Sequence, residues 1–221
     1  MNVTAIRYIA LAFSMKQEIK IIFLTLIAVC LLPVIAVFML TQVGIDAVSG
    51  VLVSNDPQTT QVDIHDPATG AIIDHVETSV MWPINGPVTL EFGQVFLPYD
   101  PFHTGIDIAS PNHEVGDPVG AFMAGKVIYA GETSWGFGKH VEIDNGHHIT
   151  SIYAHLDSIA VQEGDEVVVG TIIGARGNTG WSTGPHLHFE IKVFGIPVNP
   201  RVFLTGDPPA NPPQQIINSQ S

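Results

Sequence analysis

The sequence predicts an all-β domain of compact antiparallel sheets, preceded by one N-terminal transmembrane helix. From Val88 onward, short β-branched runs alternate with glycine turns, and no helical period persists for ten residues or more. Before this region, residues 21–40 form a run of twenty positions without a charge. At 1.5 Å per residue, such a run spans about 30 Å as a helix, which is the thickness of a hydrocarbon core.

The charges that flank this run predict its orientation. Three bases and one acid precede it, whereas 20 of the 21 acids and 5 of the 8 bases follow it. Because positive flanks stay in the cytoplasm, residues 1–20 are predicted to be a cytoplasmic tail and the bulk of the chain to lie outside the cell membrane. A cleaved signal peptide is the alternative, but the run exceeds the usual length of about 7 to 15 residues, and no small-x-small cleavage site follows it. The sequence therefore favours an uncleaved, single-pass anchor.

The composition argues against nucleic acid and anionic wall polymers as partners, and it rules out an intrachain disulfide bond. The formal net charge of −13 argues against nucleic acid as a partner, because phosphate backbones select basic surfaces. It also argues against simple adhesion to anionic wall polymers. The single cysteine, Cys30, lies inside the apolar run, so no intrachain disulfide can form.

Residues 41–81 are polar and poor in aromatic side chains, which predicts a spacer after the membrane helix. Within it, β-branched runs at 61–64 and 71–80 flank the turn residues Asp-Pro-Ala-Thr-Gly at 66–70, a pattern that indicates a β-hairpin. Such a spacer would move a domain off the membrane. At the other end, residues 205–221 contain four prolines and are predicted to be a disordered tail.

The domain between these segments, residues 82–204, is predicted to consist of short strands. Asp144-Asn145-Gly146 supplies the residues that a hairpin turn with positive φ requires, and the strands on either side of it are predicted to pair. The strands are expected at 126–130, 139–143, 148–153, 166–169, 171–174 and 187–193.

Three short patterns in this domain make chemical sense together. They are His-Thr-Gly-Ile-Asp at 103–107, Tyr-Ala-His-Leu at 153–156 and His-Leu-His at 186–188. A catalytic zinc site takes three side-chain ligands and keeps its fourth position for water. His103, Asp107 and one histidine of His-Leu-His would supply two imidazoles and a carboxylate.

The spacing of His-Leu-His predicts that both imidazoles share one face of a strand. One can bind the metal while the other faces the same water, and spacing alone leaves open whether His186 or His188 is the ligand. His155 is predicted to be a second histidine outside the ligand set. Two such imidazoles beside an activated water could share proton abstraction and stabilisation of the oxyanion formed from a peptide carbonyl.

Further short segments accompany the three patterns in a fixed order. In order and spacing, the whole series resembles the lysostaphin-like (LytM-type) zinc endopeptidases that cut peptidoglycan peptides, over about residues 82–204. The segments are Trp82-Pro83-Ile84-Asn85-Gly86-Pro87, Phe92-Gly93, His103 to Asp107, Gly125-Lys126-Val127, Gly136-Phe137-Gly138, Tyr153-Ala154-His155-Leu156, Gly164-Asp165, Gly177-Asn178-Thr179-Gly180 and Gly184-Pro185-His186-Leu187-His188-Phe189-Glu190.

The resemblance implies a fold, a cofactor and a role for each motif residue. The fold would be the duplicated hybrid motif of that family, with one Zn²⁺ per chain. His103, Asp107 and His188 match the family's zinc ligands, and His155 and His186 match its two catalytic histidines. The implied substrate is the peptide part of peptidoglycan.

A few residues lie outside this match. Where the family often has Gly-Thr-Pro-Val after the first motif, this chain has Val-Gly-Asp-Pro-Val at 115–119, a peripheral change that bears on loop length. Tyr99 could donate to the oxyanion if its loop folds over the zinc, and a surface position is the alternative. Trp135, Phe137 and Trp181 could line a groove for an extended peptide, whereas core packing explains Trp82.

The sequence therefore predicts a membrane-anchored zinc metalloendopeptidase that hydrolyses peptide bonds in peptidoglycan cross-links or stems. The alternative is a non-enzymatic wall-binding or amidase-activating module on the same fold. Such relatives typically lack one or more of the metal or catalytic residues, and all five are present in this chain. Partners in a secretion, conjugation or cell-division apparatus would leave the chemistry unchanged.

Overall fold

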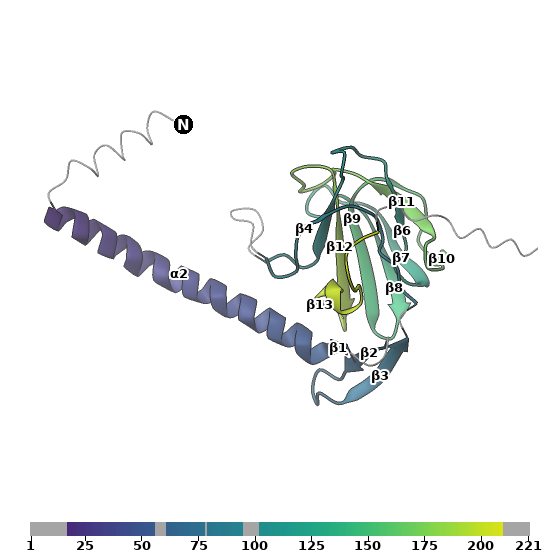
Figure 1. Ribbon diagram of the computed structural model, residues 1–221, viewed down its shortest axis with the longest axis horizontal. Helices are drawn as coiled ribbons and strands as arrows, with labels where there is room; N and C mark the ends of the chain where they lie inside the picture. The colour runs from purple at the N-terminus through teal and green to yellow at the C-terminus, as the bar shows by residue number, and fades with distance from the viewer. Residues whose placement is uncertain (1–16, 56–60, 78, 95–101, 210–221) are drawn as a thin grey trace, which may run out of the picture. The chain divides into compact units, whose positions relative to one another are not determined.

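The computed structural model describes residues 17–55, 61–77, 79–94 and 102–209 (Figure 1). The chain divides into two compact units, Met1–Gly44 and Ile45–Ser221. Most of the predicted cytoplasmic tail, most of the predicted C-terminal tail and Tyr99 lie outside the described residues.

One long helix, α2 (Gln17–Leu52), contains the apolar run and extends beyond both of its ends. Apolar side chains between residues 19 and 32 are exposed along it, among them Phe23 and Leu24. In the described part of the chain, no helix combines the length and the apolarity that crossing a membrane requires. The transmembrane assignment of residues 21–40 stays a prediction.

A small antiparallel sheet follows this helix, with the strands β1 (Val53–Asn55), β2 (Gln61–His65) and β3 (Ile72–Glu77) in that order. The predicted hairpin is present as β2 and β3, and the Asp66 carboxylate accepts hydrogen bonds from two backbone amides of its turn. Strand β1 was not predicted. It pairs with β2 and joins the hairpin to the end of α2.

A ten-stranded sheet forms the main domain, and every strand pair of the described chain is antiparallel. The principal order is β10-β7-β8-β9-β12-β5-β4, while β11 pairs with β6 and β9, and β13 pairs with β12. A short 3₁₀ turn, η1 (Pro200–Val202), follows the last strand. The expected all-β domain is confirmed. Its strands are β4 (Val88–Leu90), β5 (Ile106–Ala109), β6 (Pro118–Gly120), β7 (Gly125–Glu132), β8 (Lys139–Gly146), β9 (Ile149–Ile159), β10 (Glu166–Val167), β11 (Ile172–Arg176), β12 (His186–Val193) and β13 (Ile196–Val198).

Strand β12 shows how the sequence pattern positions the chemistry. Leu187, Phe189 and Ile191 alternate into the buried core, so the residues between them point to the opposite face. In the ladders, His188 lies opposite Asp107 of β5 on one side and opposite Ala154 of β9 on the other. The three sequence patterns therefore meet on three adjacent strands.

The predicted turn at Asp144-Asn145-Gly146 was misplaced. These residues are the end of β8, and the turn is formed by His147 and His148, with φ angles of 51° and 62°. Two successive positive φ angles match the twist of a two-residue hairpin, a conformation usually given to Asn-Gly. The imidazole of His148 stacks on Phe194, with ring centroids 4.2 Å apart, which helps to hold the turn.

Candidate metal centre

Three predicted ligands converge beside the β5–β12 ladder. His103 Nε2 lies 2.9 Å from Asp107 Oδ1 and 2.9 Å from His188 Nδ1, and His188 Nδ1 lies 3.0 Å from Asp107 Oδ1. Among the described residues, this is the one group of three or more His, Cys, Asp or Glu side chains that could hold a metal ion. Gly105 allows the approach of the two strands, because a Cβ there would lie 2.3 Å from the Phe189 carbonyl oxygen.

The donor atoms fit a small divalent cation. Tetrahedral zinc with ligand distances near 2.0–2.1 Å places its ligand atoms about 3.3 Å apart, and the observed separations of 2.9–3.0 Å differ by a few tenths of an ångström. Two imidazoles and one carboxylate are also a donor set that catalytic zinc accepts.

The charges of this centre also favour a cation. Burial raises the pKa of Asp107, but hydrogen bonds from His103 and His188 outweigh burial and hold the pKa of that carboxyl below its usual range. Burial lowers the pKa of His188, yet the hydrogen bond to Asp107 and the nearby Glu190 carboxylate raise it to about 9. The centre therefore stabilises positive charge beside Asp107, which a proton or a metal ion can supply.

Two contacts outside the triad orient its imidazoles. His103 Nδ1–H donates to the Glu91 carbonyl oxygen at 3.2 Å, which leaves Nε2 for the metal. His188 Nε2 lies 3.5 Å from Glu190 Oε2, and this carboxylate oxygen accepts the hydroxyl of Thr104. A carboxylate behind a ligand histidine fixes the tautomer and the orientation of the ring.

Sequence reasoning gave no role to Glu190 or Thr104. A signal for Glu190 was available, because it follows His188 by two residues on a strand and so lies on the same face.

His155 and His186 have matching local geometry. His155 Nδ1–H donates to the Thr179 carbonyl oxygen at 2.8 Å, and His186 Nδ1–H donates to the Gly184 carbonyl oxygen at 2.8 Å. In each ring Nε2 is then the unprotonated nitrogen that can accept a proton. The ring centroids are 4.8 Å apart, and His186 Nε2 lies 3.6 Å from Asp107 Oδ2.

The backbone at His155 is unusual. Its φ is 62°, and the β8–β9 register shifts between the pairs Lys139↔Leu156 and Val141↔Tyr153, so β9 carries one extra residue there. A β-bulge of this kind redirects a side chain, and a positive φ on a non-glycine residue marks strain that surrounding contacts hold in place. The bulge is what turns His155 toward His186.

The environment of both of these histidines favours the neutral imidazole. Burial lowers the pKa of His155 to about 3, and the neighbouring His186 adds to the effect. Burial also lowers the pKa of His186. The structure thus brings all five predicted site residues together, with two imidazoles able to accept protons beside a cation-binding triad; their roles as ligands and catalysts stay predictions.

The aromatic residues predicted near the site differ in their surroundings. Trp82 is buried, as core packing predicts, at 8% exposure. The Phe137 ring stacks on His188 with centroids 5.7 Å apart. Trp135 and Trp181 are exposed on the loops before β8 and before β12.

The segment that departs from the family pattern, residues 115–119, has a structural partner. Its Asp117 carboxylate pairs with the guanidinium of Arg176, a side chain that is fully buried. The same guanidinium donates to the carbonyl oxygens of Asn85 at 3.0 Å and Ala109 at 2.8 Å. Arg176 therefore ties the end of β5 to the loop before β4.

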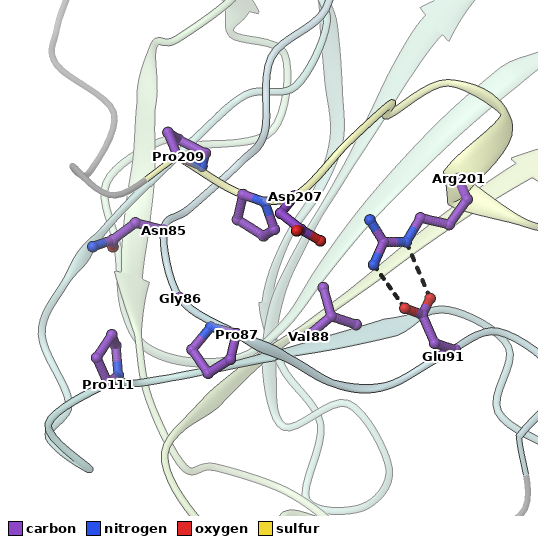
Figure 2. Close-up of a pocket in the computed structure, with 10 residues that line it drawn as sticks. Asn85, Gly86, Pro87, Val88, Glu91, Pro111, Arg201, Asp207 and Pro209 are labelled. Carbon is purple, nitrogen blue, oxygen red and sulfur yellow. Dashed lines mark hydrogen bonds and ion pairs between the residues drawn. The ribbon is translucent and has the colours of Figure 1, made fainter.

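A cavity of about 520 Å³ lies on the outer side of β4 and contains none of the five site residues. Figure 2 shows the Arg201 guanidinium turned toward the Glu91 carboxylate, with N···O distances of 2.7 and 3.2 Å. The Glu91 side chain makes this ion pair, whereas its backbone carbonyl oxygen accepts from His103. The lining residues are Asn85, Gly86, Pro87, Val88, Glu91, Pro111, Arg201, Asp207, Pro208 and Pro209.

Known proteins share this domain. The sequence profile of Peptidase family M23 matches residues 101–200. The DD-carboxypeptidase/endopeptidase Mpg of Neisseria meningitidis serogroup B is 44% identical over 98 residues, which cover 44% of this chain and 22% of Mpg. The murein hydrolase activator NlpD of Escherichia coli K12 is 37% identical over 123 residues, which cover 56% of this chain and 30% of NlpD. The chain thus spans less than a third of the length of either relative.

A solved structure agrees with this grouping. The catalytic domain of the antimicrobial peptidase lysostaphin from Staphylococcus simulans is 31% identical, with a TM-score of 0.50. The similarity covers 55% of this chain and 93% of that domain. The residues that the family profile matches, 101–200, include all five residues of the site.

Proposed function

Because this chain belongs to peptidase family M23, we propose that it is a membrane-anchored zinc metalloendopeptidase that hydrolyses peptide bonds in peptidoglycan cross-links or stems. Family membership confirms the resemblance to the lysostaphin-like enzymes. The observation that carries the proposal is the meeting, in one centre, of a triad that could bind a cation with two adjacent histidines whose Nδ1 atoms are held by backbone carbonyl oxygens.

The triad would hold the zinc ion through His103 Nε2, an oxygen of Asp107 and His188 Nδ1. One carboxylate leaves the ion with residual positive charge, and zinc bound there would polarise the peptide carbonyl and acidify a water molecule. Glu91 and Glu190 keep the two ligand imidazoles in the tautomers that this arrangement needs.

His155 and His186 would move the proton. Each presents an unprotonated Nε2 because its Nδ1–H is donated to a backbone carbonyl oxygen. The histidine that takes the proton of the attacking water becomes an imidazolium, which stabilises the oxyanion and then gives a proton to the leaving amine. Positioned acid–base groups contribute about 10² to 10⁴ in rate. Two adjacent imidazoles allow one to transfer the proton while the other donates to the oxyanion.

The similarity to a murein hydrolase activator favours a second candidate, a module that stimulates another wall hydrolase. An activator needs no complete zinc site, whereas this chain retains all five residues in one centre. The two candidates differ in what the isolated protein does, since only the enzyme releases products from peptidoglycan by itself.

The membrane anchor and the location outside the cytoplasm rest on the sequence. Residues 21–40 carry no charge, and the positive flank precedes them. The exposed apolar side chains between residues 19 and 32 of α2 have the character that a lipid environment favours. Carbonate extraction of cell membranes tests the anchor, and recovery of the protein in the extracted supernatant would refute it.

The activity test uses the purified protein, zinc and purified peptidoglycan, with mass spectrometry of the released muropeptides. We expect His188→Ala to lose zinc, and His155→Ala to retain zinc but release no products. His113→Asn is the matched control, because His113 is exposed, and asparagine tolerates its φ of 57°. Full zinc occupancy in His188→Ala, or full activity in His155→Ala, would remove that residue from its assigned role. Stimulation of an added amidase without products of its own would establish the activator.

A further inference from the structure

Two tryptophans lie exposed and in contact beside the metal centre. Trp135 is 72% exposed and Trp181 is 47% exposed, and their ring centroids are 4.9 Å apart at an interplanar angle of 45°. The remaining tryptophan, Trp82, is only 8% exposed. Large aromatic side chains on a surface leave apolar area in water, and such patches commonly mark binding sites.

The loops that carry this pair are held rigidly together. The Trp181 backbone N–H donates to the Gly136 carbonyl oxygen at 2.8 Å. Gly138 and Gly180 meet at positive φ, and a Cβ on Gly180 would lie 2.4 Å from that same Gly136 oxygen. The tryptophan pair is therefore preorganised, so a ligand would bind it with little cost in ordering the loops.

The two loop segments that carry the pair contain no charged residues of their own. Segments 133–138 and 177–185 contain no Asp, Glu, Lys or Arg, although the chain has a net charge of −13. Their polar side chains are hydroxyls and one amide, among them Ser134, Asn178 and Thr183. An exposed indole face flanked by neutral hydrogen-bonding groups suits a sugar ring, whose C–H face stacks on one indole while its hydroxyls make hydrogen bonds. A charged peptide side chain would find no ion partner on these two segments.

The pair also adjoins the residues that would move the proton. Ser182, the neighbour of Trp181, has its hydroxyl 3.2 Å from His186 Nδ1. Thr179, two residues before Trp181, holds His155 through its carbonyl oxygen. Trp181 is thus one residue from Ser182 and two from Thr179, and consecutive Cα atoms are 3.8 Å apart. The tryptophan pair therefore lies close to the bond that the two histidines would help to cleave.

We propose that Trp135 and Trp181 form a platform for an N-acetylhexosamine ring of the glycan strand that bears the substrate peptide. The inference rests on the proposed function, in which the cleaved peptide is attached to that strand. At the attachment point the sugar's carboxyl group is consumed in an amide, so the ring is neutral and matches the uncharged loops. The platform would make the enzyme prefer peptides that still carry their sugar.

The kinetic test compares two substrates for the whole chain loaded with zinc. One is a cross-linked muropeptide with its sugars, and the other is the same cross-linked peptide after an amidase has removed them. Trp135→Ala and Trp181→Ala are each expected to lower kcat/KM about 10-fold on the first substrate and less than about 2-fold on the second. Trp135→Phe keeps an aromatic face and should remain close to wild type. An equal fall on both substrates would indicate a peptide contact and overturn the inference, as would unchanged rates on both.

A binding experiment separates this inference from the proposed function. Tryptophan fluorescence is titrated with a tetramer of N-acetylglucosamine, which contains no peptide bond to cut. A saturable change in the wild type that is lost in Trp181→Ala supports the platform even if the protein cleaves no peptidoglycan. No saturable change at millimolar tetramer would overturn the platform, whatever the hydrolytic activity.

Discussion

Glu190→Gln tests how the second carboxylate of the centre supports zinc binding. The Glu190 side chain is 2% exposed, with Oε2 at 3.5 Å from His188 Nε2 and Oε1 at 3.3 Å from Lys192 Nζ. The substitution keeps the shape of the side chain and removes its negative charge. Glu190 Oε2 also accepts a hydrogen bond from the Thr104 hydroxyl, so the substitution weakens that hydrogen bond as well.

The expected loss follows from this geometry. Two full unit charges at 3.5 Å interact by about 5 kcal/mol at an effective dielectric constant of 20, which is a ceiling because a ligand imidazole carries only part of the metal's charge. Substitutions behind a metal ligand typically weaken metal affinity 10- to 100-fold, or about 1.4 to 2.8 kcal/mol. We therefore expect Glu190→Gln to raise the zinc Kd about 10- to 100-fold.

Competition with a chromogenic chelator measures that Kd. Glu166→Gln is the matched control, because it removes the same charge from an exposed position on β10. Circular dichroism of both variants checks that the sheet is intact. If Glu190→Gln binds zinc as tightly as the wild type while folding normally, the orienting role of Glu190 is wrong.

Three further changes probe the supports of the centre. Asp117→Ala leaves the buried guanidinium of Arg176 without its carboxylate and should lower the free energy of unfolding in urea by about 3 kcal/mol; a loss below about 1 kcal/mol would contradict the pairing. Arg201→Met removes the ion pair with the half-exposed Glu91 side chain, and we expect less than about 1 kcal/mol of lost stability. The zinc Kd should rise at most 3-fold, because His103 contacts the backbone carbonyl oxygen of Glu91 and not its side chain. Zinc at 100 times its Kd should raise the free energy of unfolding by about 2.7 kcal/mol, reversibly with a chelator, and a zinc-independent urea midpoint would contradict a folded-state site.

The sequence predicts the sheet and the five site residues for separate reasons. Strand periodicity is local, so β7, β8 and β12 are found close to their expected positions. The site residues were identified by the order of the motifs, and the alternation of β12 explains why His186 and His188 share a face.

The features that were not predicted depend on contacts between distant segments. The bulge that gives His155 a positive φ arises from the β8–β9 register, which no local pattern encodes. The contact of Trp135 with Trp181 needs two loops brought together across strands. The turn at 147–148 was missed because Asp144-Asn145-Gly146 is the stronger local turn signal, whereas the observed turn at His147 and His148 is accompanied by packing of His148 on Phe194.

Anomalous diffraction at the zinc edge, from crystals of the zinc-loaded protein, tests the central claim most directly. The account predicts one peak per chain, within about 2.0–2.2 Å of His103 Nε2, His188 Nδ1 and an Asp107 oxygen, with His155 and His186 nearby but unbound. A peak elsewhere, a peak bonded to His186 in place of His188, or no peak at saturating zinc would contradict it.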